Sequence, residues 1–185
     1  YAEIADAKVM LSRAVAPHCS GLLVDGYYGY WSTVAANAVP GGTGILIRVE
    51  KSGAPKNAAG APMGEFEQGW GVGKIKRCGA DAVKLLAQFE PDEFASAEHN
   101  FEFTRQVWEQ CIEHDILFLL EPIHFAYKVN GQDETKEAVT GRKARTVIES
   151  ARILSRYCDV YKAEFPGTSG VDSDATLTDN LKRLN

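Results

Sequence analysis

Hydrophobic residues follow two alternating patterns along the chain. Short continuous apolar runs, bounded by glycine, proline or charged residues, are typical of strands that are buried on both faces. Five such runs occur, at positions 21–25, 44–50, 80–86, 116–121 and 159–164. Elsewhere apolar residues recur every three or four positions, which indicates helices around 4–15, 103–112 and 144–154. We also expect a glycine-rich helix over 66–78, a loop over 52–64 and the start of a last helix around 177–184.

The predicted strands alternate with helices, and this order predicts a parallel sheet. Two architectures have such a sheet, the (β/α)8 barrel and the open doubly wound sheet. A nucleotide-binding open sheet needs a glycine-rich phosphate turn directly after a strand. The nearest stretch, residues 69–74, has neither the GxGxxG nor the GxxxxGK[ST] spacing and follows no convincing strand. We therefore expect an α/β fold of the (β/α)8 TIM-barrel type, with residues 1–185 in a single domain.

Most of the predicted strands end on charged residues. In a (β/α)8 barrel the C-terminal ends of the strands carry the chemistry. A charge on a buried strand costs free energy unless it is paired or faces a polar cavity, so several such charges indicate a shared polar pocket. The charged residues in question are Asp25, Arg48, Glu50, Lys84, Glu121, Lys162 and Glu164.

Lys84, Glu121 and Lys162 are the most informative of these residues. They are separated by 37 and 41 residues, and each gap fits one helix with its loops, so the three residues are expected on consecutive strands. The backbones of the two lysines would then lie roughly 10 Å apart, with Glu121 between them. In a dry pocket, a lysine beside a second cation loses its proton more readily and can attack a carbonyl carbon, while a carboxylate moves protons. This arrangement favours Schiff-base aldolase chemistry, although a purely structural ion pair would leave the same pattern.

Composition and charge argue against several other functions. The 185 residues are 45% apolar and 24% charged, with a net charge of −5, which is typical of a globular domain and argues against nucleic acid as a partner. No apolar run approaches the ~20 residues of a membrane span, so we expect no membrane partner. The four cysteines are scattered, which predicts reduced thiols in a cytoplasmic protein. Cys111 and His114 lack a second pair of metal ligands, and a lone His124 is more often a packed or surface residue.

Three segments resemble the tagatose-1,6-bisphosphate aldolase family, which comprises class I aldolases of the (β/α)8 fold. They are Gly-Ala-Asp-Ala-Val-Lys-Leu-Leu at 79–86, Phe-Leu-Leu-Glu at 118–121 and Asp-Val-Tyr-Lys-Ala-Glu-Phe-Pro at 159–166. Residues 22–29 and 50–53 also match family segments, in the same order. The resemblance implies that Lys162 is the Schiff-base lysine and that Lys84 and Glu121 assist it. It further implies that Asp25 holds a substrate hydroxyl and that Lys51 lies at the rim of the site.

The resemblance also implies the reaction. It is that of a metal-independent aldehyde-lyase without a cofactor, which cleaves a phosphorylated ketose such as tagatose 1,6-bisphosphate to dihydroxyacetone phosphate and an aldehyde. The partner is then a sugar-phosphate substrate, and a homo-oligomer is left open. Two departures from the family line the expected pocket: Gly-Tyr-Tyr-Gly at 26–29 replaces a Pro-Glu pair before Tyr-Gly, and Ala-Gln-Phe at 87–89 replaces a stretch with tyrosines and an aspartate. Two alternatives therefore stay open, a sulfofructosephosphate-type aldolase and a non-catalytic sugar-phosphate-binding regulator on the same barrel.

The length of the chain sets one more expectation. A complete (β/α)8 barrel typically needs about 250 residues, whereas this chain of 185 residues has five predicted strands. By the resemblance these are strands two to six. We therefore expect a partial barrel that exposes unpaired sheet edges and apolar surface and does not fold alone. The phosphate site that such barrels frequently build after strands seven and eight would then lie outside the chain.

Overall fold

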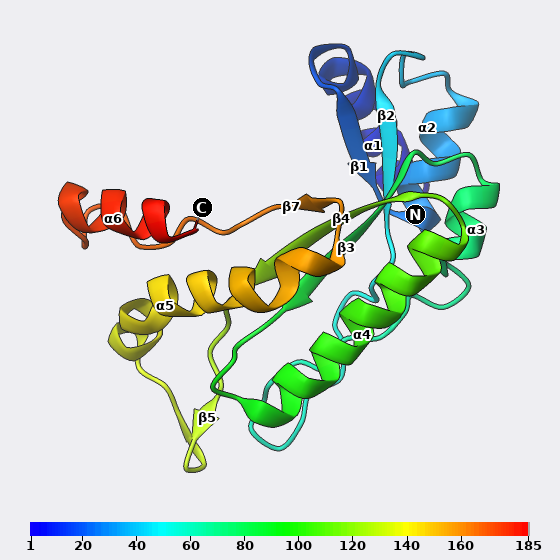
Figure 1. Cartoon of the computed structure of the whole chain (residues 1–185). Coiled ribbons are helices and arrows are strands. Elements are labelled where there is room, and N and C mark those ends of the chain that lie inside the picture. Colours follow the sequence, from blue (N-terminus) through cyan, green and yellow to red (C-terminus); the bar gives the residue numbers. More distant parts are fainter. Residues whose placement is uncertain (185) are drawn as a thin grey trace.

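The computed structural model describes residues 1–184, and its centre is a five-stranded parallel sheet (Figure 1). The strands are β1 (Gly21–Val24), β2 (Gly44–Arg48), β3 (Ala82–Gln88), β4 (Leu117–Ile123) and β7 (Val160–Tyr161). They lie side by side in chain order, and every neighbouring pair is parallel. All five strands predicted from the apolar runs are confirmed. Parallel strands in sequential order are the arrangement of a (β/α)8 barrel.

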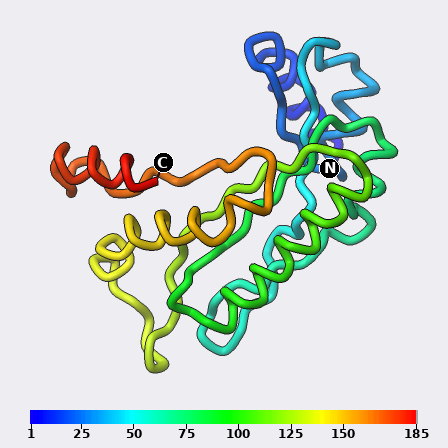
Figure 2. The backbone as a smooth tube through the Cα atoms, in the orientation of Figure 1, coloured from blue at the N-terminus to red at the C-terminus, as the bar shows by residue number. Residues whose placement is uncertain are grey.

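Helices connect the strands. The α-helices are α1 (Ala2–Val15), α2 (Trp31–Ala35), α3 (Val72–Arg77), α4 (Phe94–Glu113), α5 (Lys136–Leu154) and α6 (Asp174–Leu184), and single turns form at η1 (Ala16–His18), η2 (Gly26–Tyr30) and η3 (Ser155–Tyr157). Side-chain caps set the starts of the two longest helices. Glu93 accepts a hydrogen bond from the N–H of Ser96 at the start of α4, and Thr135 accepts one from the N–H of Ala138 at the start of α5. Figure 2 shows that α6 follows an extended segment after β7, and α6 packs against α5.

The two faces of the sheet have different environments, because successive side chains of a strand point to opposite sides. One face forms the core with helices α3, α4 and α5, and its fully buried side chains include Ile47, Val83, Leu85, Phe118 and Leu120. The opposite face, here called the inner face, carries Leu46, Ala82, Leu117, Leu119 and Val160, which line an open cavity of about 400 Å³. Continuing the same alternation toward the C-terminal ends places Lys84, Glu121 and Lys162 on the inner face.

The outer strands expose apolar surface, as the sequence predicts. Among the described residues, β1 and β7 each have a single neighbouring strand. Leu23 on β1 and Val160 on β7 are about half exposed. The predicted apolar face of α1 is exposed as well, since Ile4 and Leu11 face solvent and Ser12 is the buried residue of this helix. No helix within residues 1–184 is long and apolar enough to cross a membrane.

The prediction of a helix over 66–78 is wrong for the first half of this range. Only the later part is helical and forms α3. Gly69 adopts a φ of +71°, and Gly71 has extended backbone before the helix begins, so the helix cannot extend further back. Phe66 instead forms an antiparallel bridge with Glu50, and Trp70 is buried. A Cβ added to Gly26 would lie 2.1 Å from the Trp70 ring, so the turn after β1 requires glycine at this position.

A short hairpin of β5 (Lys128–Val129) and β6 (Gln132–Asp133) follows β4. The apolar pattern does not predict it, because its residues are mostly polar and exposed. Arg142 of α5 holds the base of the hairpin: its Nε donates to Glu90 at 2.7 Å and its Nη1 to Glu134 at 2.6 Å. Glu90 is fully buried directly after β3, so this ion-pair group ties the hairpin to the sheet.

Candidate active site

Lys84 lies in the middle of β3 on the inner face. It is in register with Arg48 of β2 and with Leu119 of β4. Its side chain is only 5% exposed, and a buried ammonium needs a carboxylate nearby. Two carboxylates meet this need: Nζ of Lys84 lies 3.1 Å from Oε2 of Glu121 and 3.8 Å from Oε1 of Glu50.

Glu121 on β4 joins Lys84 to Lys162. Its Oε1 lies 2.5 Å from Nζ of Lys162, while its Oε2 contacts Lys84. Burial acts to raise the pKa of Glu121, but the hydrogen bonds and charges of the two lysines outweigh burial and hold the pKa below its ordinary value. The ionised carboxylate is therefore favoured. The structure brings the three residues together in the order expected from their spacing, with Glu121 in the middle.

Lys162 is the exposed member of this group. It follows β7 directly, and its N–H donates to the carbonyl oxygen of Leu120 at 2.8 Å. Its side chain is 60% exposed, so the dry pocket expected around both lysines is found only around Lys84. Lys162 is exposed because it follows an edge strand: among the described residues, β7 has a neighbouring strand on one side only.

Glu50 adds a second carboxylate next to Lys84. Burial raises the pKa of Glu50 above its ordinary value, although Lys84, Arg48 and nearby backbone N–H groups favour the ionised form. Its Oε2 is buried and accepts no hydrogen bond from any described residue. Glu50 also lines a cavity of about 310 Å³ between the ends of β2 and β3 and the loop that follows β2. In the sequence Glu50 is recognisable as a charged strand end, without an assigned role.

Asp25 and Lys51 lie near the site without contacting Lys84, Glu121 or Lys162. Asp25 follows β1, where its Oδ1 accepts hydrogen bonds from the N–H groups of Tyr27 and Tyr28 at 3.1 and 2.7 Å, and its Oδ2 pairs with Lys8. Burial acts to raise the pKa of Asp25, but these partners outweigh it and lower the pKa. Lys51 lines the cavity beside Glu50, and its Nζ lies 2.6 Å from Oε1 of Glu65. Both predicted substrate-binding residues therefore have protein partners.

His124 and Glu164 form a pair that sequence analysis does not predict. Glu164 accepts hydrogen bonds from the backbone N–H of His124 at 2.7 Å and from its Nδ1 at 2.8 Å. Lys143 of α5 lies 3.6 Å from the same carboxylate. Burial acts to raise the pKa of Glu164, but His124 and Lys143 outweigh it and lower the pKa. A period-two count from Lys162 would place Glu164 on the inner face, but β7 ends at Tyr161 and Lys143 belongs to α5 on the core face, so the count does not predict this neighbourhood.

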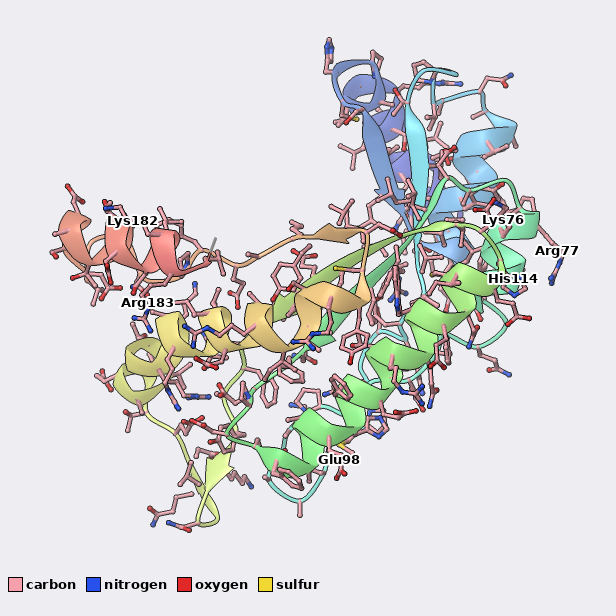
Figure 3. The ribbon with its side chains drawn as sticks, viewed as in Figure 1. Lys76, Arg77, Glu98, His114, Lys182 and Arg183 are labelled. Atoms are coloured by element: carbon pink, nitrogen blue, oxygen red, sulfur yellow. The ribbon has the colours of Figure 1, made fainter. Side chains whose placement is uncertain are left out.

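The opposite end of the sheet has a separate polar group. Figure 3 shows Lys76, Arg77 and His114 close together where α3 meets the end of α4, next to the N-terminal ends of the strands. The Nζ of Lys76 donates there to the carbonyl oxygen of Asp115, so the group secures a helix end. Within residues 1–184, no group of three or more His, Cys, Asp or Glu side chains could hold a metal ion.

The fold and the site together indicate the structural class of the protein. Five consecutive parallel strands, with charged side chains that meet on the inner face of the sheet, form part of a (β/α)8 barrel. Solved structures agree in fold. An archaeal fructose-1,6-bisphosphate aldolase, solved with its catalytic lysine covalently bound to the carbinolamine intermediate of its substrate, superposes with a TM-score of 0.59 at 13% identity, over 98% of this chain and 62% of that chain. A Corynebacterium glutamicum protein gives a TM-score of 0.58 at 17% identity, over 85% of this chain and 50% of its own.

The sequence places the chain in a family. Residues 1–184 match the family described as DeoC/LacD family aldolase, and the chain belongs to this family. It is 32% identical over 168 residues to tagatose 1,6-diphosphate aldolase 1 of Enterococcus faecalis, covering 89% of this chain and 50% of that protein. It is also 32% identical over 166 residues to the tagatose 1,6-diphosphate aldolase of Listeria innocua, covering 89% of this chain and 48% of that protein. The chain thus spans about half the length of these curated relatives.

Proposed function

We propose that this chain carries the Schiff-base site of a class I aldolase that cleaves a phosphorylated ketose, such as tagatose 1,6-bisphosphate, to dihydroxyacetone phosphate and an aldehyde. One observation carries the proposal: Glu121, in the C-terminal half of β4, contacts both Lys84 of β3 and Lys162 directly after β7, on the two strands beside β4. Membership of an aldolase family and relatives named tagatose 1,6-diphosphate aldolase support it.

Lys162 is the proposed nucleophile. Its amine, in the unprotonated form, adds to the ketone carbon of the substrate, and the carbonyl oxygen takes up a proton. The resulting carbinolamine loses water and becomes an iminium that withdraws electrons from the neighbouring carbon–carbon bond. The 60% exposure of the Lys162 side chain leaves its amine open to such a substrate. The archaeal aldolase captured with a carbinolamine on its own lysine is a precedent for the first intermediate.

Glu121 is the proposed carrier of protons. In the cleavage step a base removes the proton of the hydroxyl on the far side of the breaking bond. The electrons of that bond pass to the iminium, which becomes a neutral enamine, and the aldehyde leaves. The same carboxyl then returns a proton to the enamine carbon, and water releases the ketone product and the free lysine. The contact of Glu121 with Nζ of Lys162 at 2.5 Å supports this role.

Lys84 is proposed to hold Glu121 in position and to donate hydrogen bonds to substrate oxygen atoms. Its buried ammonium lies against Glu121 and is fixed by the sheet on both sides, so its charge is rigidly placed. Asp25 and Lys51 are proposed as substrate contacts at the rim. Since Lys8 and Glu65 already engage them, a substrate would exchange these ion pairs for its own hydroxyl or phosphate groups.

Turnover on a panel of ketose phosphates tests the proposal, with release of dihydroxyacetone phosphate as the readout. We expect one or more members to be cleaved, and Lys162→Arg to lose roughly 1,000-fold or more, because a guanidinium stays protonated and cannot form an iminium. The matched control is Lys128→Arg on the exposed hairpin, which should retain full turnover. Cleavage that persists in Lys162→Arg would contradict the assignment. Binding of a panel member without cleavage would favour a sugar-phosphate-binding regulator instead.

A further inference from the structure

Glu50 has a buried carboxylate oxygen for which residues 1–184 provide no hydrogen-bond partner. Its Oε1 faces Lys84 at 3.8 Å, but Oε2 accepts no hydrogen bond from any described residue. A buried polar atom without a partner is costly, and native proteins rarely leave one without a purpose. The other buried carboxylate after a strand, Glu90, shows the contrast, because both its oxygens have partners in Arg142 or Thr146.

The surroundings of Glu50 are those of a ligand site. The side chain lines the cavity of about 310 Å³ together with Leu86 and Gln88 of β3 and Lys51 of the rim. The side chain of Gln88 makes no hydrogen bond with any described residue, while its backbone carbonyl oxygen accepts one from the side chain of Asn100. An ionised carboxylate accepts hydrogen bonds and cannot donate them. The ligand group that matches Oε2 of Glu50 is therefore a donor, such as a sugar hydroxyl.

The distance between Glu50 and Lys162 fits a short sugar chain. Arg48 is in register with Lys84, and Leu86 with Glu121, so Glu50, Leu86, Glu121 and Lys162 lie in line across four strands. At ~4.8 Å per strand, the backbones of Glu50 and Lys162 are at most about 14 Å apart. With bonds of about 1.5 Å, the lysine arm spans about 6 Å and the glutamate arm about 4 Å. A hydroxyl four carbons from the amine needs about 9 Å, from five zigzag bonds and one hydrogen bond of about 2.8 Å. This length lies between the roughly 4 Å left when both arms lean toward each other and the roughly 14 Å left when both stand perpendicular to the sheet.

We infer that Glu50 is a specificity-determining residue, whose Oε2 accepts a hydrogen bond from a hydroxyl on the aldehyde half of the ketose, beyond the bond that is cleaved. The inference rests on the proposed function, because it takes Lys162 as the point where the ketone is bound. It assigns the cavity beside β2 and β3 to the leaving aldehyde. Lys84 then lies between the two halves of the substrate. It contacts Glu121 on the side of the iminium and Glu50 on the side of the aldehyde.

The variant Glu50→Gln tests this inference, because the amide has nearly the same shape. The ammonium of Lys84 can only donate, so the amide oxygen will face Lys84 and the NH2 group will take the place of Oε2. An acceptor thereby becomes a donor. The measurement is kcat/KM for a cleaved ketose phosphate and for its analogues that lack one hydroxyl at the carbons past the new aldehyde group.

In the unsubstituted protein, we expect one deoxy analogue to be about 10- to 100-fold poorer than the parent sugar, as for the loss of a hydrogen bond to a charged group. In Glu50→Gln this ratio should fall to near one. A general loss of activity cancels in the ratio, so a merely structural role would not change it. Glu102→Gln on the surface of α4 is the matched control and should keep the ratio of the unsubstituted protein.

An unchanged ratio in Glu50→Gln, with cleavage intact in the unsubstituted protein, would overturn the inference and leave the proposed function standing. Absence of cleavage in the unsubstituted protein would instead contradict the proposed function, and the inference with it. If Glu50→Gln is too slow to assay, Glu50→Asp allows the same comparison. Its shorter carboxylate remains an acceptor and should keep part of the preference for the hydroxylated sugar. Loss of the entire preference both in Glu50→Asp and in the control Glu102→Gln would contradict the role of Glu50.

Discussion

The ammonium of Lys84 lies 3.1 Å from Oε2 of Glu121, and the fold covers Lys84 almost completely, with 5% of its side chain exposed. This pair is the fixed part of the site. The third member, Lys162, reaches the other oxygen of Glu121 from a largely exposed position. A rigid buried pair beside an accessible amine is an arrangement in which one charge is held while another group reacts.

The Lys84–Glu121 pair is predicted to be strongly coupled in stability. Glu121→Gln leaves the buried ammonium of Lys84 with Glu50, 3.8 Å away, as its one remaining carboxylate among the described residues, so we expect a loss of about 3 kcal/mol in the free energy of unfolding. Lys84→Met combined with Glu121→Gln should recover part of this loss, because no buried charge is left alone. Urea unfolding of the two single variants and the double variant measures the coupling. Simply additive losses would show that the pair is not coupled.

Two arginines on α5 provide a matched comparison. Arg142 is the partner of the fully buried Glu90, whereas Arg145 pairs with Asp92 where both side chains are substantially exposed. We expect Arg142→Met to cost about 3–5 kcal/mol, because Glu90 then loses its cation, and Arg145→Met to cost less than about 1 kcal/mol. Chemical denaturation gives both values. Hydrogen exchange should also show faster opening of the β5–β6 hairpin in Arg142→Met alone, and equal effects of the two substitutions would contradict the role of Arg142.

The ion pair of Asp25 with Lys8 predicts a pH dependence of stability. The pKa of Asp25 is lowered from an ordinary value of 3.8, so its ionised form contributes stability above that value and loses it as the pH falls through the lowered pKa. Asp25→Asn keeps an oxygen for the N–H groups of Tyr27 and Tyr28 but removes the charge. We expect it to be less stable by roughly 0.5–1 kcal/mol at pH 7, and the difference to vanish in acid. A difference in stability between the two proteins that grows below pH 4 would contradict the role of the ionised Asp25.

The sheet could be predicted from the sequence because its strands are continuous apolar runs between glycines and prolines. The hairpin could not be found in the same way, since it is too short and polar to show a hydrophobic pattern. Its turn nevertheless carries a local signal: Asn130 and Gly131 both adopt positive φ, and Asn-Gly is the pair that favours tight hairpin turns. The helix over 66–78 fails because glycines interrupt the periodic apolar residues, and Phe66 pairs with Glu50 instead.

The candidate site was predictable as far as strand order decides it. Lys84, Glu121 and Lys162 meet because they lie on the same face of consecutive parallel strands, and the long side chain of Lys84 reaches Glu121 from within β3. The exposure of Lys162 and the partners of Asp25 could not be read from spacing, because they depend on which strand is outermost and on where Lys8 of α1 reaches. The pairing of Glu164 with His124 likewise depends on loop paths after the strands.

Borohydride trapping is the most direct test of Lys162 as the Schiff-base lysine. The protein is incubated with dihydroxyacetone phosphate, the iminium is reduced to a stable amine, and the modified peptide is identified by mass spectrometry. We expect one adduct, located on Lys162, which is absent in Lys162→Arg and unchanged in Lys128→Arg. An adduct on Lys84 or another lysine, or an equal adduct in Lys162→Arg, would contradict this assignment.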